Sequence, residues 1–128
     1  MTVHVLLPLN TLPTENEQAV TTPKVAAATG TSREYREFVG FSKASFFLHV
    51  TAASGVVPTL DVVVQYRNEQ NPTIWHTLVT FPQQTAATGG TPITPIAADI
   101  LAETYRAVWT ITGTTPSFSF TLNCVMTA

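Results

Sequence analysis

The alternation of residue types that decides the fold is clearest in residues 103–126, which read ETYRAVWTITGTTPSFSFTLNCVM. Side chains on a strand point alternately to its two faces, so apolar residues at every second position predict a half-buried strand. One such series precedes residues 113–116 and another follows them, and the glycine and proline between them predict a turn. The first series is Tyr105, Ala107, Trp109 and Ile111, and the second is Phe118, Phe120, Leu122, Cys124 and Met126.

The same period of two runs through much of the chain upstream. Further strands are expected at residues 2–9, 32–41, 44–52, 60–66 and 73–81. The turn-rich residues 67–72 predict that the last two strands form a hairpin. The residues expected to share a face within one strand are Phe46, Leu48 and Val50; Leu60, Val62, Val64 and Tyr66; and Trp75, Thr77, Val79 and Phe81.

About seven or eight short strands at even spacing predict an all-β fold. With no internal repeat and no second domain apparent, residues 1–128 are expected to form a single antiparallel β-sandwich or jelly-roll-like domain. The pattern alone leaves both a jelly-roll and an immunoglobulin-like topology open. A chain of this length buries roughly two-thirds of its unfolded surface, so its core needs no disulfide bonds.

The composition is poor in charge and rich in threonine. Charged residues make up 11% of the chain, against roughly 25% in an ordinary domain, while threonine occurs 23 times. A net charge of −2 gives no basic footprint for nucleic acid. We find no apolar run that would span a membrane and no signal-peptide pattern. Because residues 70–98 contain no Lys, Arg, Asp or Glu, we expect protein rather than water to cover this tract.

The groups that could perform catalysis or bind a metal are few and scattered. His4, His49 and His76 lie on different expected strands without metal-ligand spacing, and no nucleophile-elbow or phosphate-loop motif occurs. Cys124 shares a face with apolar residues, so we expect a buried small hydrophobe rather than a nucleophile. The sequence therefore predicts no enzyme activity, no metal and no cofactor.

Two other groups of residues have both a structural and a functional interpretation. Trp109 is expected in the core, whereas Trp75 either packs in the core or forms, with Tyr66, an exposed platform on which a sugar stacks. A mixed cluster of charges either is a solvated face or forms salt bridges between subunits. Its members are Arg33, Glu34, Arg36 and Glu37.

Two segments resist assignment to regular structure and are candidates for contact with other proteins. Residues 1–23 are expected to form an extended N-terminal arm, in which Val3, Val5 and Leu7 could add to the sheet edge of a neighbour. The Gly- and Pro-containing residues 82–98 form a long loop, and such loops are often functional. Ile93 and Ile96 in this loop are either exposed apolar anchors or a lid over the sandwich.

Two strand-and-turn segments, with a tryptophan strand between them, carry a resemblance to a known group. They are FLHVTAASG (47–55) followed by PTLDVVVQ (58–65), WHTL (75–78), and YRAVWTITGT (105–114) followed by PSFSF (116–120). Over residues 38–124 the chain resembles small virion structural proteins of tailed bacteriophages. The resemblance implies a head decoration (cement) protein or a minor structural protein, with a compact β-fold and frequently a trimeric state on the capsid lattice.

We therefore expect a non-enzymatic structural protein on the capsid surface of a virion. Its expected partners are the major capsid protein or another virion protein and further copies of itself, with a trimer favoured and neither nucleic acid nor membrane involved. A charge-poor surface suits this role because the cores of protein interfaces are depleted in charge. The alternatives are a tail or other minor virion structural protein, and a β-sandwich carbohydrate-binding module.

Overall fold

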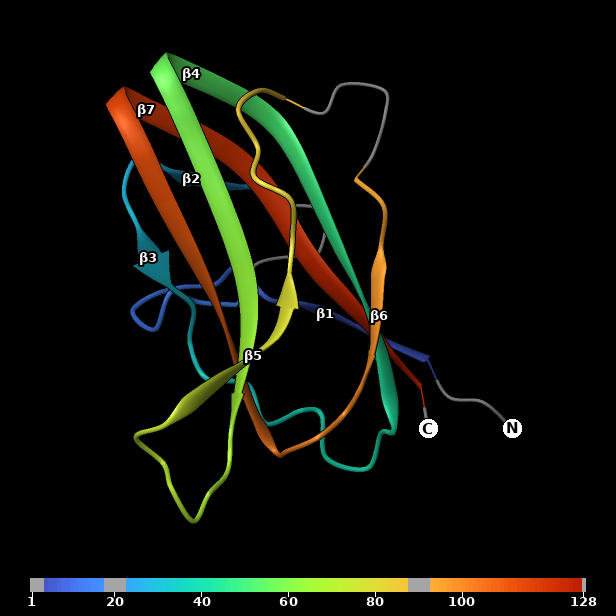
Figure 1. Cartoon of the computed structure of the whole chain (residues 1–128). Helices are drawn as coiled ribbons and strands as arrows, with labels where there is room; N and C mark the ends of the chain where they lie inside the picture. Colours follow the sequence, from blue (N-terminus) through green and yellow to red (C-terminus); the bar gives the residue numbers. More distant parts are fainter. Residues whose placement is uncertain (1–3, 18–22, 88–92, 128) are drawn as a thin grey trace.

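The computed structural model describes residues 4–17, 23–87 and 93–127, and within these residues it contains strands and no helix. Two of the strands are very long, and the others are short pieces along the edges of the long pair (Figure 1). The strands are β1 (His4–Pro8), β2 (Lys24–Ala26), β3 (Gly30–Thr31), β4 (Lys43–Arg67), β5 (Trp75–Thr80), β6 (Ile96–Asp99) and β7 (Thr104–Thr127).

The frame of the molecule is a ribbon made of β4 and β7. The two strands, of 25 and 24 residues, pair antiparallel from Lys43 opposite Thr127 to Arg67 opposite Thr104. Halfway along, the ribbon folds back so that its two limbs face each other (Figure 1). The turn expected at residues 113–116 is therefore wrong, because these residues are a bend within a continuous strand, and residues 54–55 bend β4 in the same way.

Each limb of the ribbon gains short strands on both sides and becomes one layer of a sandwich. In the first limb β1 pairs with the end of β7 and β6 pairs with the start of β4. In the second limb β3 pairs with the first half of β7 and β5 pairs with the end of β4. The short strand β2 also pairs with β7, at residues 118–120, so each long strand counted twice gives nine strand segments in the two layers. The predicted all-β, antiparallel sandwich is thus confirmed.

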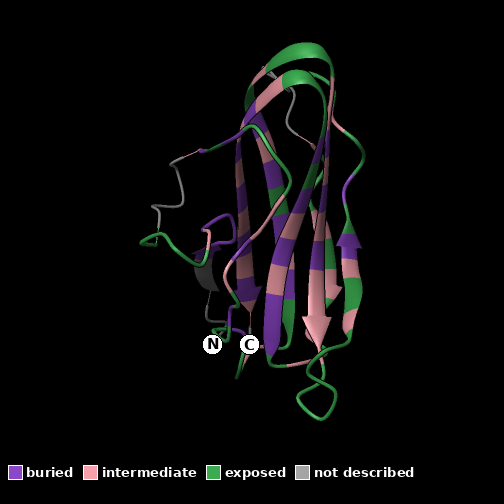
Figure 2. Cartoon of the chain, turned by 90° about the vertical axis from the view of Figure 1, so that its left-hand side faces the viewer, coloured by how far each residue is buried: buried purple, intermediate pink, exposed green. Residues whose placement is uncertain are grey.

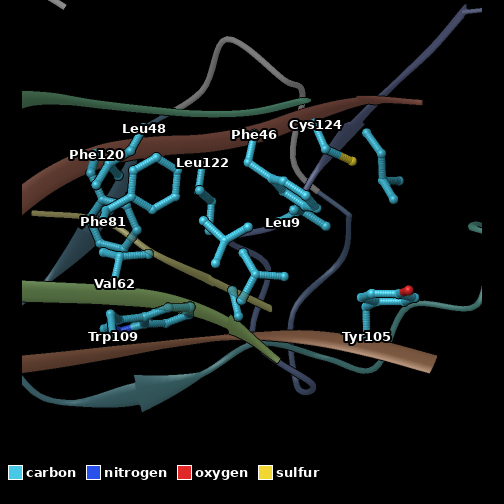
Figure 3. Packing of buried hydrophobic residues seen from close by; sticks show 14 of the residues in the cluster. Leu9, Phe46, Leu48, Val62, Phe81, Tyr105, Trp109, Phe120, Leu122 and Cys124 are labelled. Atoms are coloured by element: carbon cyan, nitrogen blue, oxygen red, sulfur yellow. The ribbon is translucent and has the colours of Figure 1, made fainter. Parts of the chain in front are cut away.

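The core lies between the two limbs and is built from every second residue of both long strands. The burial pattern alternates along the strands, as Figure 2 shows. Across the sandwich, Trp109 of one limb meets Phe120 of the other edge-to-face, with ring centroids 5.5 Å apart (Figure 3). The predicted inward series of residues 46–50, 60–64, 105–111 and 118–126 are all confirmed.

A bulge in the β4–β5 hairpin changes which residues of β5 face the core. The hairpin itself is confirmed, but its register shifts between Val64 and Gln65. Val64 lies opposite Val79 in the core, whereas Arg67 lies opposite Trp75 on the outer face. The prediction that residues 75–81 place one alternating series on a single face is wrong, because the bulge inserts a residue and inverts the alternation.

The two bends share one short motif, which corrects the expectation that the chain has no repeat. Residues 54–59 read SGVVPT and residues 112–117 read TGTTPS. Gly55 and Gly113 have φ angles of 111° and 124°, while Val57 and Thr115, the residues before the prolines, have φ of 49° and 48°. The bends also cross closely, since a Cβ on Gly55 would lie 2.8 Å from the Cα of Pro116, and one on Gly113 would lie 2.9 Å from the Cα of Pro58.

Residues 32–41 do not form the predicted strand. A single bridge pairs Tyr35 with Tyr105, and a turn follows at residues 37–40. The aromatic side chains that suggested a strand instead close one end of the core, where Phe38 stacks on Tyr105 with ring centroids 4.2 Å apart. Burial of aromatic side chains therefore explains the pattern without a regular strand.

The expected N-terminal arm is part of the fold wherever the structure describes it. β1 pairs with β7 of the same chain, with Leu7 opposite Cys124. Leu7 and Leu9 are buried in the core, and the Asn10 side-chain amide donates to the Phe120 carbonyl at 3.1 Å. The prediction of an extended arm is wrong for residues 4–11, while Val3 and residues 18–22 lie outside the described residues.

Candidate functional site

A network of ion pairs within the chain gathers at one end of the molecule. Arg33 binds Glu17 and Glu37, both at 2.7 Å, and Arg67 binds Glu34 at 2.9 Å. Arg36 and Glu69 lie 3.5 Å apart, which extends the same network. Exposed pairs of this kind contribute roughly 0–1 kcal/mol each. The mixed cluster predicted from sequence thus forms salt bridges within one subunit.

Lys24 is the one buried cation among the described residues, and it is paired with Glu15 at 2.7 Å. The hydrogen bond from Lys24, followed by one from the Leu12 amide, holds the pKa of Glu15 below its usual value. The pKa of Glu37 is also lowered, because hydrogen bonds from Arg33 and from the Arg36 amide outweigh the opposing effect of burial. Both carboxyl groups therefore favour the ionised form in the folded state.

These depressed pKa values predict a loss of stability in acid. A carboxyl whose folded-state pKa lies below the unfolded value of 4.5 stabilises the fold above that pH and loses its contribution as the pH falls through its folded-state pKa. We expect the Tm to fall between pH 5 and pH 3, and to fall less steeply in Glu15→Gln. Thermal melts across this range test the expectation, and parallel curves for the two proteins would contradict it.

Trp75 is half-buried on the outer face of the sandwich between two arginines. The guanidinium carbon of Arg106 lies 4.0 Å from the centre of the Trp75 ring, and that of Arg67 lies 5.2 Å from it. Arg106 is held by a hydrogen bond from its Nε to Oε1 of Gln65 at 2.8 Å. Since Arg67 and Arg106 are cations against its π face, Trp75 is part of the charged end of the molecule.

Tyr66 points to the opposite face of the same sheet, where it stacks on His76 with ring centroids 5.3 Å apart. The two aromatic residues therefore cannot form one platform, and the predicted sugar-stacking pair Tyr66 and Trp75 is wrong. The prediction required Tyr66 and Trp75 to lie on the same face of the sheet. Residues that lie opposite each other on neighbouring strands share a face, and Tyr66 lies opposite His76 rather than Trp75.

The described part of the uncharged tract, residues 70–87 and 93–98, lies along one side of the sandwich. It contains β5, the outermost strand of the second limb, and residues 96–98 of β6, the outermost strand of the first, which ends at the charged Asp99. The strands β5 and β6 approach each other (Figure 1). Natural proteins usually protect such edge strands with charged side chains. Here the described residues 70–87 and 93–98 carry none, and we call this surface the β5–β6 flank.

The predicted interface residues lie deeper in the fold than expected. Ile93 and Ile96 are half-buried and pack against the core, as the lid interpretation predicts, and Ile96 pairs with Phe46. Leu7 is 8% exposed, and Val5 belongs to β1 opposite Met126. Leu7, Ile93 and Ile96 are therefore not free apolar anchors.

No cluster of three His, Cys, Asp or Glu residues that could hold a metal occurs within the described part of the chain. Cys124 is fully buried, and burial raises the pKa of its thiol to about 12, so it remains protonated at neutral pH. A hollow of about 470 Å³ is lined by Tyr66, His76, Glu69 and Glu103 among others. The Thr104 hydroxyl donates to Glu69 and lowers the pKa of that carboxyl, so Glu69 favours the ionised form and is not poised as a general acid.

The bend of the ribbon is the most exposed apolar part of the described surface. Val57 is 79% exposed and Val56 is 63% exposed, at the end of the sandwich seen at the top of Figure 2. Val57 also has φ of 49°, and a left-handed conformation costs an ordinary L residue about 1–2 kcal/mol. We call residues 54–57 and 112–115 the bend tip. The repeated Gly-x-x-Pro spacing was the sequence signal for it.

A second apolar feature lies on the edge of the sandwich beside β2. It is a hollow of about 230 Å³, and its lining includes Val25, Ala26, Ala27, Ala28, Gly30 and Trp109. Val25 is 66% exposed on its rim. Lys24, which also lines the hollow, is neutralised by Glu15. We call this feature the β2 hollow.

No helix among the described residues is long and apolar enough to cross a membrane.

Comparison with known proteins leaves the function open. No family model matches the chain, and no curated protein matches it. Among solved structures, it is similar to the K3 cleaved adhesin domain of Lys-gingipain from Porphyromonas gingivalis, with 15% sequence identity and a TM-score of 0.30. The match covers 98% of this chain and 73% of that chain. A similarity at this level carries no argument about function, so the function has to be inferred from the residues of the chain itself.

Proposed function

We propose that this chain is a non-enzymatic structural protein of a tailed-phage virion that decorates the capsid by binding the major capsid protein. The observation that carries the proposal is the β5–β6 flank, in which β5 and residues 96–98 of β6 carry no charge, while the last residue of β6, Asp99, lies opposite Lys43 at one end of the flank. An uncharged edge can be desolvated at low cost and can pair with a strand of another protein.

The distribution of charge supports this orientation of the molecule. Arg33, Arg36 and Arg67 lie in internal ion pairs with glutamates, and Arg106, which lies against Trp75 at the edge of the flank, is hydrogen-bonded to Gln65. Binding through the flank would therefore bury few charges that lack a partner within the chain. Asp61, beside the flank, is already hydrogen-bonded to Gln83 at 2.9 Å. Many weak contacts across a capsid lattice would then add to a stable attachment.

The resemblance over residues 38–124 to small virion structural proteins points the same way. A carbohydrate-binding module is the less supported alternative because Tyr66 and Trp75 lie on opposite faces. A tail or other minor virion protein shares the features of the flank, so it is an outcome of the test below.

The location of the protein in purified particles of the phage that encodes it tests the proposal. We expect subnanometre maps to contain a β-sandwich on the outside of the head, with β5 and β6 towards the capsid protein. Absence from the particle would overturn the proposal, and density in the tail would assign the protein to the alternative class.

A single added charge tests the flank itself. Thr77 is exposed on β5, so Thr77→Lys would place a charge against the capsid protein. We expect at least a tenfold loss of affinity for heads that lack the protein, about 1.4 kcal/mol, measured by co-sedimentation. Thr14→Lys is the control, since Thr14 is an equally polar, exposed residue in a turn beside β3, on the opposite edge of the sandwich. Equal binding by the two variants would contradict the assignment.

A further inference from the structure

The bend tip combines two features that both work against the stability of an isolated chain. Val57 is the most exposed large hydrophobic residue described, and it is β-branched with a positive φ of 49°. Thr115 repeats the unfavourable backbone conformation, with φ of 48°, at the equivalent position of the second bend. Such conformations are rare for β-branched residues, and they concentrate at functional sites.

Neither feature is needed to make the bend. Glycine or asparagine adopts a positive φ with less strain, and a polar residue would be better solvated at such an exposed position. Val56, 63% exposed, enlarges the apolar surface of the tip. An exposed and strained valine is therefore explained by a contact that it makes outside the chain.

The charge around the tip restricts the partner. Residues 50–60 and 107–127 contain no Lys, Arg, Asp or Glu, so the tip offers no charge to a partner. A charged surface pressed against it would lose hydration without gaining a counter-ion. The complementary partner surface is therefore concave, apolar and electrically neutral.

The chain itself carries a surface with these properties, the β2 hollow. Its charge is balanced, because Lys24 is paired with Glu15 at 2.7 Å, and alanines, Val25 and Trp109 supply apolar lining. Its volume of about 230 Å³ is several times the ~30 Å³ that one water occupies. The six side-chain carbons of two valines fit within such a space.

We propose that the bend tip of one copy inserts Val56 and Val57 into the β2 hollow of a second copy. The inference rests on the proposed decoration role, for which association with further copies of the chain is expected, and it names the surfaces of that association. Because the tip and the hollow are different parts of the chain, the contact is heterologous, and it produces a closed ring when the rotation between copies closes. One contact would thus cover both the exposed valines of the tip and Val25 on the rim.

The test is the mass of the purified full chain, measured by native mass spectrometry and analytical ultracentrifugation. Val57→Asn removes the apolar side chain while tolerating the positive φ, so we expect a higher Tm together with at least a tenfold weaker self-association. Ala28→Glu places a charge in the β2 hollow and is expected to weaken association to a similar degree. Val39→Asn changes a valine that is 60% exposed in the turn at residues 37–40, and we expect it to associate like the natural chain.

Each result supports or overturns the contact. A natural chain that stays monomeric at every concentration would overturn it, and so would either Val57→Asn or Ala28→Glu with an unchanged oligomer mass. Binding to phage heads is measured separately with the same variants. Head binding by a monomeric chain would overturn only this inference, whereas a stable oligomer that is absent from virions would overturn only the proposed function.

Discussion

Gly113→Ala is expected to lower the free energy of unfolding by about 3 kcal/mol or more. Gly113 has φ of 124°, which an L side chain rarely adopts, and an added Cβ would lie 2.9 Å from the Cα of Pro58 and 3.0 Å from the Val57 carbonyl oxygen. Both obstructing atoms are backbone, and they belong to the other bend, so neither can move aside without unbending the ribbon. Urea denaturation measures the loss.

Gly40→Ala is the matched control because it isolates the backbone preference from the close approach. Gly40 also has a positive φ, 91°, but nothing lies within 4 Å of an added Cβ. We expect a cost of about 1 kcal/mol there. Gly55→Ala should behave like Gly113→Ala, since its Cβ would lie 2.8 Å from the Cα of Pro116. Equal losses at Gly40 and Gly113 would mean that the crossing of the bends does not stabilise the fold.

The inward face of each strand could be predicted from sequence because side-chain direction is a local property of the backbone. Phe46, Leu48 and Val50 alternate in the sequence and are buried together in the structure. The β4–β5 hairpin was predictable for the same reason, since residues 68–74 join its strands directly. Local period and local turn residues were sufficient for both.

The connections between strands were not predictable, because they depend on contacts between distant residues. Gly55 and Gly113 with the prolines that follow them indicate turns, and a turn would pair residues on either side of it. Instead, residues before the first bend pair with residues after the second, as Leu48 pairs with Leu122. Glycine with positive φ and proline are compatible with either geometry, so the local signal is ambiguous.

The candidate site was predicted in part. The absence of charge in residues 70–98 is visible in the sequence, but its place along two edge strands follows only from the topology. The prediction that Tyr66 and Trp75 form a sugar-stacking platform was wrong because of a single inserted residue. The bulge after Val64 decides which face of the sheet Trp75 occupies. Bulges leave no distinctive residue pattern here, so the face of Trp75 could not be read from alternation.

The two tryptophans therefore provide a direct test of the arrangement of the layers. Trp109→Ala is expected to cost about 3–5 kcal/mol. Trp109 is 1% exposed, packs edge-to-face on Phe120, and lies against Gly30, where an added Cβ would be 2.6 Å from the indole Nε1. Removal of the indole ring would leave a cavity between the two limbs of the ribbon, and neither limb can move in to fill it. Trp109→Phe, which keeps an aromatic ring, should lose less and remain folded.

Trp75→Ala is the control. It distinguishes the outer-face position of Trp75 in the structure from the core position that the sequence left open. Trp75 lies outside the sandwich, and the cation–π contacts with Arg67 and Arg106 that it would lose are worth about 1 kcal/mol or less at partly exposed sites. Fluorescence follows both variants: Trp75→Ala keeps the blue-shifted emission of buried Trp109, and Trp109→Phe retains only the redder emission of Trp75. If Trp75→Ala lowered the free energy of unfolding as much as Trp109→Ala, both rings would lie in the core. The assignment of Trp75 to the outer face by the bulge would then be wrong.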